Sequence, residues 1–317
     1  MTGNFSILDF HCDTASEILD GRTLYDNKGM LSIKKMQEGG VGCQFFAMYI
    51  KMSDFKSAAE GYGQLRIIYD NFIKELAQNE KYIALARNSK EISDIRDQGK
   101  IAAVLSVEEG EVLDNKLERL DELYAMGVRL ITISWNFENC IGFPHSSEPE
   151  LMKNGLKPFG IEAVNRMQEL GMLVDVSHLS DGGFWDVAKL SKKPFVASHS
   201  NARSLCPHTR NMTDEMIKAL ADSGGVTGIN FVCKFLNADE EGSIKQMMDH
   251  IKHIRNVGGI DVLALGSDFD GTIKPSELGN CANFPMLTDA ISKAGFSDED
   301  VEKICWKNAM RVIGEVL

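Results

Sequence analysis

The 317-residue sequence lacks several features that mark particular classes of protein. It has 34 Lys and Arg against 46 Asp and Glu, and the formal net charge of −12 argues against nucleic acid or an anionic membrane surface as a partner. No apolar stretch approaches the length of a membrane span, and residues 1–6 contain neither the basic nor the apolar region of a secretory signal. We therefore attribute the acidity to solubility and expect a cytoplasmic protein.

The seven cysteines are scattered, odd in number and never spaced as C-x-x-C. This pattern argues against a disulfide framework and against a zinc ribbon, so we expect reduced thiols in the core. No low-complexity linker and no fixed-period repeat divides the chain. A chain of this length can bury a large core without disulfides, and we expect one domain over residues 1–317.

Short apolar or β-branched runs alternate with longer amphipathic stretches along the chain. Apolar residues at helical spacing occur in 57–78, 117–126 and 161–170, and Thr213 and Ser297 are expected helix N-caps. The expected strands are 7–10, 42–50, 101–107, 128–134, 173–177, 195–198, 225–231 and 262–266. Eight strands joined by helices predict a (β/α)8 TIM barrel. An open doubly wound sheet also fits, but no glycine-rich phosphate loop follows the first strand.

Side chains that can bind a metal follow five of the eight expected strands. They are His11 and Asp13, Glu108 and Glu109, His178, His199, and Asp268 and Asp270. The carboxyl ends of barrel strands meet at one face, where barrel enzymes carry their chemistry. Any one of these residues alone is explained by a turn, a cap or a solvated carboxylate. Their gathering at one face predicts a centre for zinc-like ions, which prefer imidazole and carboxylate ligands.

The other histidines fit this pattern less well. His250 and His253 lie three apart in the helical stretch 243–256, and we interpret them as surface residues. His145 and His208 fall in loops on the expected active face, and their role stays open.

The strand ends carry short motifs in a specific order. They are DFHCD at 9–13, SVE at 106–108, LVDVSH at 173–178, SHSNA at 198–202, RN at 210–211 and GSDFDG at 266–271. Together they resemble the motifs of the membrane (renal) dipeptidase family, peptidase family M19, over nearly the whole chain. The resemblance implies an amidohydrolase-like barrel that hydrolyses dipeptides, including those with a C-terminal D-residue, by a hydroxide held between two metal ions.

The resemblance also implies two Zn²⁺ ions per chain. The expected ligand pairs are His11 with Asp13 for one ion and His178 with His199 for the other. Glu108 would bridge the two ions, and it is preferred over Glu109 because it directly follows Ser-Val, as in the family. Ligand types alone do not separate zinc from manganese or cobalt.

Two further residues take roles in the reaction by the same resemblance. Asp268 would accept the proton of the attacking water and pass it to the leaving amine. Arg210 would hold the terminal carboxylate of the substrate, because a guanidinium binds a carboxylate through two parallel hydrogen bonds. A fixed carboxylate anchor favours short substrates over internal peptide bonds.

One position departs from the family. Mammalian members carry a histidine after the fourth strand, thought to contact the reacting carbonyl oxygen, where this chain has Trp135. Asn136, Asn139 or His145 could replace that histidine, and we count His145 among the substrate-binding candidates. Trp135 would be either a wall of the substrate pocket or packing at the barrel rim.

Two other functions fit the sequence. One is a related binuclear amidohydrolase that acts on a non-peptide amide, and the other is a catalytically silent barrel that binds peptides. The secretory signal and the lipid-anchor tail of the mammalian enzymes are not found, which would fit a soluble prokaryotic-type enzyme. The family also implies a homodimer.

Overall fold

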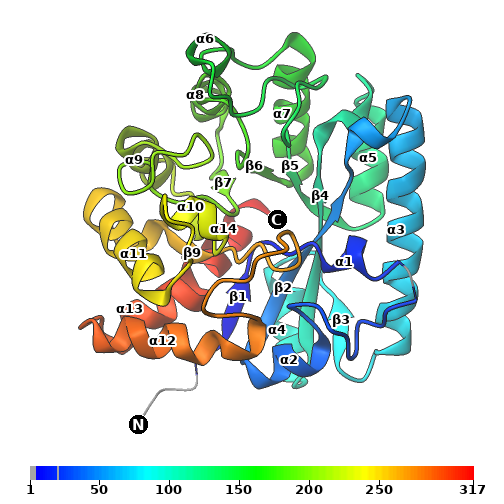
Figure 1. The fold of residues 1–317 in the computed structure, drawn as a ribbon. Helices are drawn as coiled ribbons and strands as arrows, with labels where there is room; N and C mark the ends of the chain where they lie inside the picture. The colour runs from blue at the N-terminus through cyan, green and yellow to red at the C-terminus, as the bar shows by residue number, and fades with distance from the viewer. Residues whose placement is uncertain (1–4, 20) are drawn as a thin grey trace.

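A closed barrel of parallel strands forms the centre of the computed structural model, which describes residues 5–19 and 21–317 (Figure 1). The ring runs through β1 (Ile7–Asp9), β2 (Val41–Tyr49), β4 (Ile101–Glu108), β5 (Val128–Thr132), β6 (Leu173–Asp175), β7 (Val196–Ala197), β8 (Val226–Ile229) and β9 (Leu263–Leu265). Pairing of β1 with β9 and of β2 with β4 closes the ring. The (β/α)8 TIM barrel is therefore confirmed, and the open-sheet alternative is wrong.

The sheet contains one strand that the sequence did not predict. This strand, β3 (Ile83–Leu85), pairs in parallel with the first residues of β4, through Ile83 with Ile101. It is three residues long and has a single fully buried side chain, Ile83. Such a short, half-buried segment shows no alternation long enough to predict a strand.

Helices surround the barrel on its outer face (Figure 1). The longer ones are α3 (Ala58–Gln78), α4 (Ser89–Asp97), α5 (Glu118–Ala125), α7 (Pro158–Leu170), α8 (Asp181–Leu190), α9 (Asp214–Asp222), α11 (Ile244–Gly258), α12 (Phe284–Lys293) and α14 (Asn308–Val316). The shorter ones are α1 (Thr14–Glu17), α2 (Ile33–Glu38), α6 (Pro149–Met152), α10 (Cys233–Leu236) and α13 (Asp298–Glu302). Four short 3-10 helices, η1 (Met52–Asp54), η2 (Gly110–Leu113), η3 (Ile260–Val262) and η4 (Cys281–Asn283), and one π-helix, η5 (Lys303–Lys307), complete the helical elements described. None of the helices described is long and apolar enough to cross a membrane.

Two predicted helix caps are confirmed. The Thr213 hydroxyl accepts a hydrogen bond from Met216 N at the start of α9. Ser297 and Asp300 form a reciprocal capping box at the start of α13. Both satisfy backbone N–H groups that a helix N-terminus otherwise leaves without a partner.

The end of the barrel opposite to the predicted site is closed by apolar packing. Leu173, Val196 and Val226, each at the start of its strand, share one buried cluster with Val312 and Val316 of α14. The carboxyl ends of the strands are thus the end left for polar side chains. The seven cysteines are all buried free thiols, as predicted.

The prediction that His250 lies on the surface is wrong. His250 is 1% exposed on α11, where its Nδ1 accepts a hydrogen bond from Ala202 N at 3.2 Å and its Nε2 lies 2.9 Å from Leu236 O. Its position on the inner face of the amphipathic helix places it against the loops that follow the barrel strands. His253, on the same helix, is half-buried and lies 2.8 Å from Asp214.

Candidate metal centre

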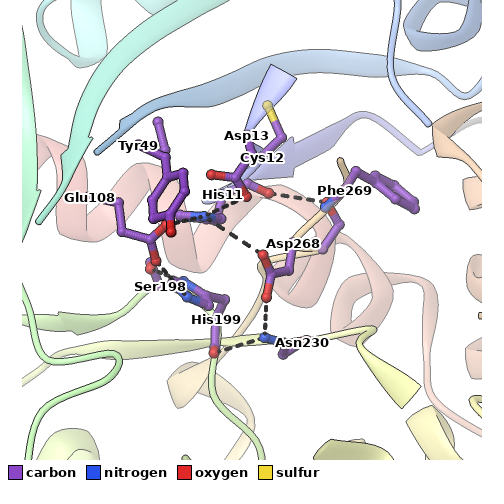
Figure 2. A network of polar contacts seen from close by, with 12 residues as sticks. His11, Cys12, Asp13, Tyr49, Glu108, Ser198, His199, Asn230, Asp268 and Phe269 are labelled. Carbon is purple, nitrogen blue, oxygen red and sulfur yellow. Dashed lines mark hydrogen bonds and ion pairs between the residues drawn. The ribbon is translucent and has the colours of Figure 1, made fainter. Parts of the chain in front are cut away.

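The side chains expected to hold metal lie together at the carboxyl ends of the barrel strands. They are Glu108, the last residue of β4, His11 and Asp13 after β1, His178 after β6, His199 after β7, and Asp268 after β9. Each is at most 9% exposed. Figure 2 shows His11, Glu108 and Asp268 turned toward a common centre. His11 and Asp268, which are 257 positions apart in the sequence, meet here because parallel strands end at one face.

Glu108 stands between two groups of side chains. Its Oε2 lies 3.6 Å from His11 Nε2, whereas its Oε1 lies 3.0 Å from His178 Nε2 and 3.4 Å from His199 Nε2. The two oxygens of one carboxylate therefore face different imidazoles, which is the geometry that a bridging ligand needs.

The neighbouring Glu109 is turned away from these histidines. Its Oε1 accepts hydrogen bonds from Asn139 Nδ2 at 2.6 Å and from Glu111 N at 3.0 Å. Asn139 is thereby committed to the protein interior, where its Oδ1 also accepts from the backbone of Ile141. Neither Glu109 nor Asn139 is available to the site.

Buried donor atoms without partners mark the centre as a cation site. His11, Asp13 and Asp268 each have a possible ligand atom within 4.8 Å of those of the other two. The same is true of His11, Glu108 and His199. Both ring nitrogens of His11 and Oδ1 of Asp13 have no hydrogen-bond partner among the described residues. Buried polar atoms normally find a partner, and this mixture of imidazole and carboxylate fits an ion such as zinc.

His178 and His199, which face Oε1 of Glu108, are each oriented by a contact at the other ring nitrogen. Their Nε2 atoms lie 3.0 Å apart. The Nδ1 atom of His178 lies 3.0 Å from Asn136 Oδ1, and the Nδ1 atom of His199 lies 2.6 Å from Ser198 Oγ. In each ring, the nitrogen that faces Glu108 is therefore the one left to bind a ligand.

The two sides of the centre differ in electrostatics. Burial alone would lower the pKa of His11, but the carboxylates of Glu108 and Asp13 raise it to about 10. Burial, with Arg210 nearby, lowers the pKa of His178 well below its usual value. Burial also raises the pKa of Glu108. A cation among these groups would relieve the repulsion between buried carboxylates and displace the proton on His11.

Several residues of the site adopt a left-handed backbone conformation that is uncommon outside glycine. The φ angles are 71° at His178, 62° at Asp268 and 66° at Asp270. Such strain concentrates at functional sites, where the surrounding structure holds it in place. The Asp270 side chain does not join the centre, because it accepts hydrogen bonds from Thr14 Oγ1 at 2.7 Å and Met30 N at 2.5 Å.

A cavity of about 470 Å³ opens over the centre. Arg210 lines this cavity and is 4% exposed. Its Nη1 lies 3.4 Å from Ser200 Oγ and its Nη2 lies 3.3 Å from His199 O. Its Nε has no hydrogen-bond partner among the described residues. Burial lowers the pKa of Arg210 to about 10, so the guanidinium stays charged at neutral pH. A buried cation with spare donors in a cavity is suited to bind an anion.

Trp135 and His145 also line the cavity. The Trp135 ring packs edge-on against Tyr49 with 4.9 Å between centroids. Both nitrogens of His145 have partners, since Nδ1 lies 2.8 Å from Thr209 Oγ1 and Nε2 lies 3.1 Å from Asn136 Oδ1. Burial lowers the pKa of His145 to about 3, so this ring is neutral.

Sequence reasoning missed two buried pairs behind the ligands, Asp9 with Ser267 and Asp175 with Ser198. A repeated pattern could have found them. Each aspartate stands two or three residues before a ligand-type histidine, and each serine directly precedes a histidine or aspartate of the centre. The partners are far apart in sequence, so the pattern predicts these pairs only when the order of strands in the barrel is known.

The chain is similar to known proteins along its whole length. The model of the membrane dipeptidase family, peptidase family M19, matches residues 1–317. The chain belongs to this family. Members of the M19 family are metallopeptidases, and the buried histidines and carboxylates above are the described groups that could hold the metal.

Two curated proteins resemble the chain over most of its length. It is 36% identical over 251 residues to an uncharacterized Klebsiella pneumoniae protein from the pqqA 5′ region, which covers 76% of this chain and 92% of that protein. It is 31% identical over 304 residues to the dipeptidase tcpJ of Claviceps purpurea, covering 92% of this chain and 70% of that one.

Two solved metallopeptidase structures share the fold. A metallopeptidase named dipeptidase AC superposes with a TM-score of 0.92 and 26% identity over 99% of both chains. A Rhodobacter sphaeroides metallopeptidase, liganded with a phosphinate mimic of the dipeptide L-Ala-D-Ala, superposes with a TM-score of 0.90 and 25% identity over 99% of both chains.

Proposed function

We propose that this M19 metallopeptidase is a zinc dipeptidase with two ions per chain. The observation that carries the proposal is Glu108, whose two carboxylate oxygens face different imidazole groups at 3.0–3.6 Å. Such a carboxylate can join two ions in one centre.

Each ion would have its own ligands besides Glu108. His11 and Asp13 would hold one ion, and His178 and His199 the other. When bound, the pair would lower the pKa of a water molecule and polarise the peptide carbonyl. The residues of the chain supply the rest of the reaction.

Asp268 would move the proton. Its Oδ2 accepts a hydrogen bond from Asn230 Nδ2 at 2.9 Å, while its Oδ1 lies 3.8 Å from His11 Nε2 and faces the centre (Figure 2). The side chain is thus fixed at one oxygen, and the other is left to take a proton from water and give it to the leaving amine.

Arg210 would hold the substrate, because its buried guanidinium has spare donors in the cavity beside the centre. A terminal carboxylate bound there places the preceding peptide bond near the ligands of the centre, which selects dipeptides. Trp135 and His145 would border the substrate side chains. The phosphinate mimic bound by the Rhodobacter sphaeroides protein supports a C-terminal D-residue as substrate for this chain as well.

The test measures zinc content and hydrolysis of L-Ala-D-Ala together. We expect about two zinc ions per chain, with activity lost on chelation and restored by zinc. Arg210→Ala should raise KM for the dipeptide by about 10–100-fold, since it removes hydrogen bonds to a charged group. KM for the same amide with a blocked carboxylate should not change.

Other outcomes identify the other functions. If both substrates respond alike to Arg210→Ala, the carboxylate anchor is wrong and the enzyme is an amidohydrolase of another amide. A well-folded chain that binds no zinc and hydrolyses neither substrate is a silent peptide-binding barrel.

A further inference from the structure

The barrel contains the same buried arrangement twice, an aspartate on one strand that binds a serine after the neighbouring strand. Ser198 Oγ donates to Asp175 Oδ2 at 2.5 Å, and Ser267 Oγ donates to Asp9 Oδ2 at 2.6 Å. In each pair the backbone N–H of the serine also donates to Oδ1 of the aspartate, at 2.8 and 2.7 Å. All four residues are at most 1% exposed.

The two serines differ in what else they touch. Ser198 Oγ lies 2.6 Å from Nδ1 of His199 and 3.4 Å from Ser177 Oγ. The Ser267 hydroxyl proton goes to Asp9, and its oxygen accepts from Phe269 N at 3.2 Å and lies 3.1 Å from His11 O. One hydroxyl therefore contacts the ring of a proposed metal ligand, and the other contacts the main chain beside one.

The donors around Asp175 fix the direction of the Ser198 hydroxyl. An ionised carboxylate can accept hydrogen bonds but has none to give. Its Oδ1 accepts from the backbone N–H groups of Ser177 and Ser198, and its Oδ2 accepts from Thr132 Oγ1 at 2.6 Å as well as from Ser198. The single hydroxyl proton of Ser198 thus points to Asp175, and its oxygen must accept from His199.

We propose that Asp175 and Ser198 are positioning residues that hold His199 as the Nδ1–H tautomer. Its Nε2 then presents a lone pair toward Glu108 and His178, 3.4 and 3.0 Å away. This inference rests on the proposed function in one respect, the role of His199 as a metal ligand. Groups behind a ligand histidine commonly set its tautomer and change metal affinity about 10–100-fold.

Replacing Asp175 by asparagine should reverse the tautomer. The two backbone N–H groups at the Oδ1 position require an acceptor there, so the amide nitrogen takes the Oδ2 position beside Ser198. That nitrogen donates to the Ser198 oxygen, and the hydroxyl proton turns to His199 Nδ1 at 2.6 Å, which is nearer than the other acceptor, Ser177 Oγ at 3.4 Å. The ring then carries its proton on Nε2, where it blocks the metal. Asp175→Asn should therefore weaken metal binding more than Ser198→Ala, because Ser198→Ala leaves the His199 ring able to adopt either tautomer.

The experiment compares Ser198→Ala and Asp175→Asn with the matched control Ser267→Ala. Zinc affinity is measured by competition with a chelator, folding by circular dichroism, and the ring tautomer of His199 by ¹⁵N NMR of the metal-free protein. We expect Ser198→Ala to weaken one of two zinc sites about 10–100-fold, and Asp175→Asn to weaken it further with a proton on Nε2. Ser267→Ala should keep both sites, because its hydroxyl touches no ligand ring.

Each contrary result has a distinct meaning. Equal zinc loss in Ser198→Ala and Ser267→Ala, or an unchanged tautomer in Asp175→Asn, overturns the inference. A parent protein that binds no zinc overturns the proposed function, while the NMR measurement still decides the tautomer. If Asp175→Asn does not fold, Ser198→Ala against its control decides.

Discussion

In the half of the metal centre that follows β1 and β9, His11 stands among carboxylates, with Asp13 3.4 Å and Asp268 3.8 Å from its Nε2. In the half that follows β6 and β7, His178 and His199 stand 3.0 Å from each other and share the single carboxylate of Glu108. The first half would attract a cation through its charge. The second half would bind one through imidazole rings whose other nitrogens already have hydrogen-bond partners.

The two halves are also tied to each other. Asn230 Nδ2 donates both to Asp268 Oδ2 at 2.9 Å and to His199 O at 3.2 Å (Figure 2). One amide thus links the carboxylate of the acidic half with the main chain of the imidazole half. The comparison shows two ways to prepare a cation site in one centre. The half around His11 gathers carboxylate charge, and the half around His178 and His199 orients its rings in advance through hydrogen bonds.

The largest effect is expected where the halves meet. Glu108→Gln removes the charge between them and leaves an amide nitrogen facing one set of imidazoles. We expect zinc content to fall in both halves and kcat/KM to drop by at least about 10³-fold, beyond the 10–100-fold typical of groups behind the ligands.

Glu109→Gln is the matched control for this change. Its side chain bonds to Asn139 and Glu111, and a glutamine oxygen can accept both hydrogen bonds. Zinc content and kcat/KM should stay near the parent values. Equal losses in the two variants would contradict a bridge by Glu108 and would point to a structural role of the adjacent pair.

A smaller effect should separate proton transfer from metal binding within the acidic half. Asp268→Asn keeps the side-chain shape, and asparagine tolerates the left-handed backbone at this position. We expect kcat to fall about 10²–10⁴-fold while KM and zinc content change little, measured by steady-state kinetics and metal analysis. Asp270→Asn, in the same loop but bonded to Thr14 and Met30, should leave kcat intact. Loss of zinc in Asp268→Asn would make Asp268 a ligand instead.

A moderate effect is expected at the cavity wall next to the imidazole half. Trp135→Ala removes the ring that packs on Tyr49, and we expect KM for dipeptides with large side chains to rise about 5–20-fold at constant zinc content. Phe137→Ala is its control, because Phe137 contacts Trp135 but is 45% exposed and does not line the cavity. A fall in kcat with unchanged KM would contradict a wall and indicate a role in the reaction itself.

The sequence predicted the barrel and the meeting of the proposed ligands because both follow from local patterns. Buried runs give strands, parallel strands end at one face, and His11, Glu108 and Asp268 each follow such a run. The choice between Glu108 and Glu109 was made by resemblance, and their side chains do point in opposite directions.

The features that sequence reasoning missed depend on contacts between distant segments. The role of Asp175 depends on Ser198, which follows the next strand, and β3 is too short to show a pattern. His250 looked like a polar residue on a surface helix, yet Ala202 and Leu236 supply partners for both of its ring nitrogens. A buried polar group is stable when its partners are present, and those partners cannot be read from the helix that carries it.

The smallest effect should show how the outer helices support the imidazole half. Nδ1 of His250 on α11 accepts a hydrogen bond from Ala202 N, three residues after His199. This hydrogen bond stabilises the loop after β7 only while Nδ1 is unprotonated. Burial lowers the pKa of His250; the hydrogen bond to Leu236 O and the charge of Asp249 oppose this shift, and His253 adds to it. Because the folded pKa lies below the unfolded value of about 6.5, this stabilisation is complete above pH 6.5 and is lost as the pH falls below it.

His250→Asn removes the titration while its amide oxygen can still accept from Ala202. We expect a loss of about 1–3 kcal/mol in the free energy of unfolding at pH 8, from the missing hydrogen bond to Leu236 O, measured by urea denaturation. The gap between parent and variant should narrow at pH 5, where the parent loses the contribution of its neutral imidazole. His253→Asn, which changes a half-buried residue of the same helix, should cost less at pH 8. A gap that stays constant from pH 8 to pH 5 would show that the stabilisation by His250 does not depend on its neutral form.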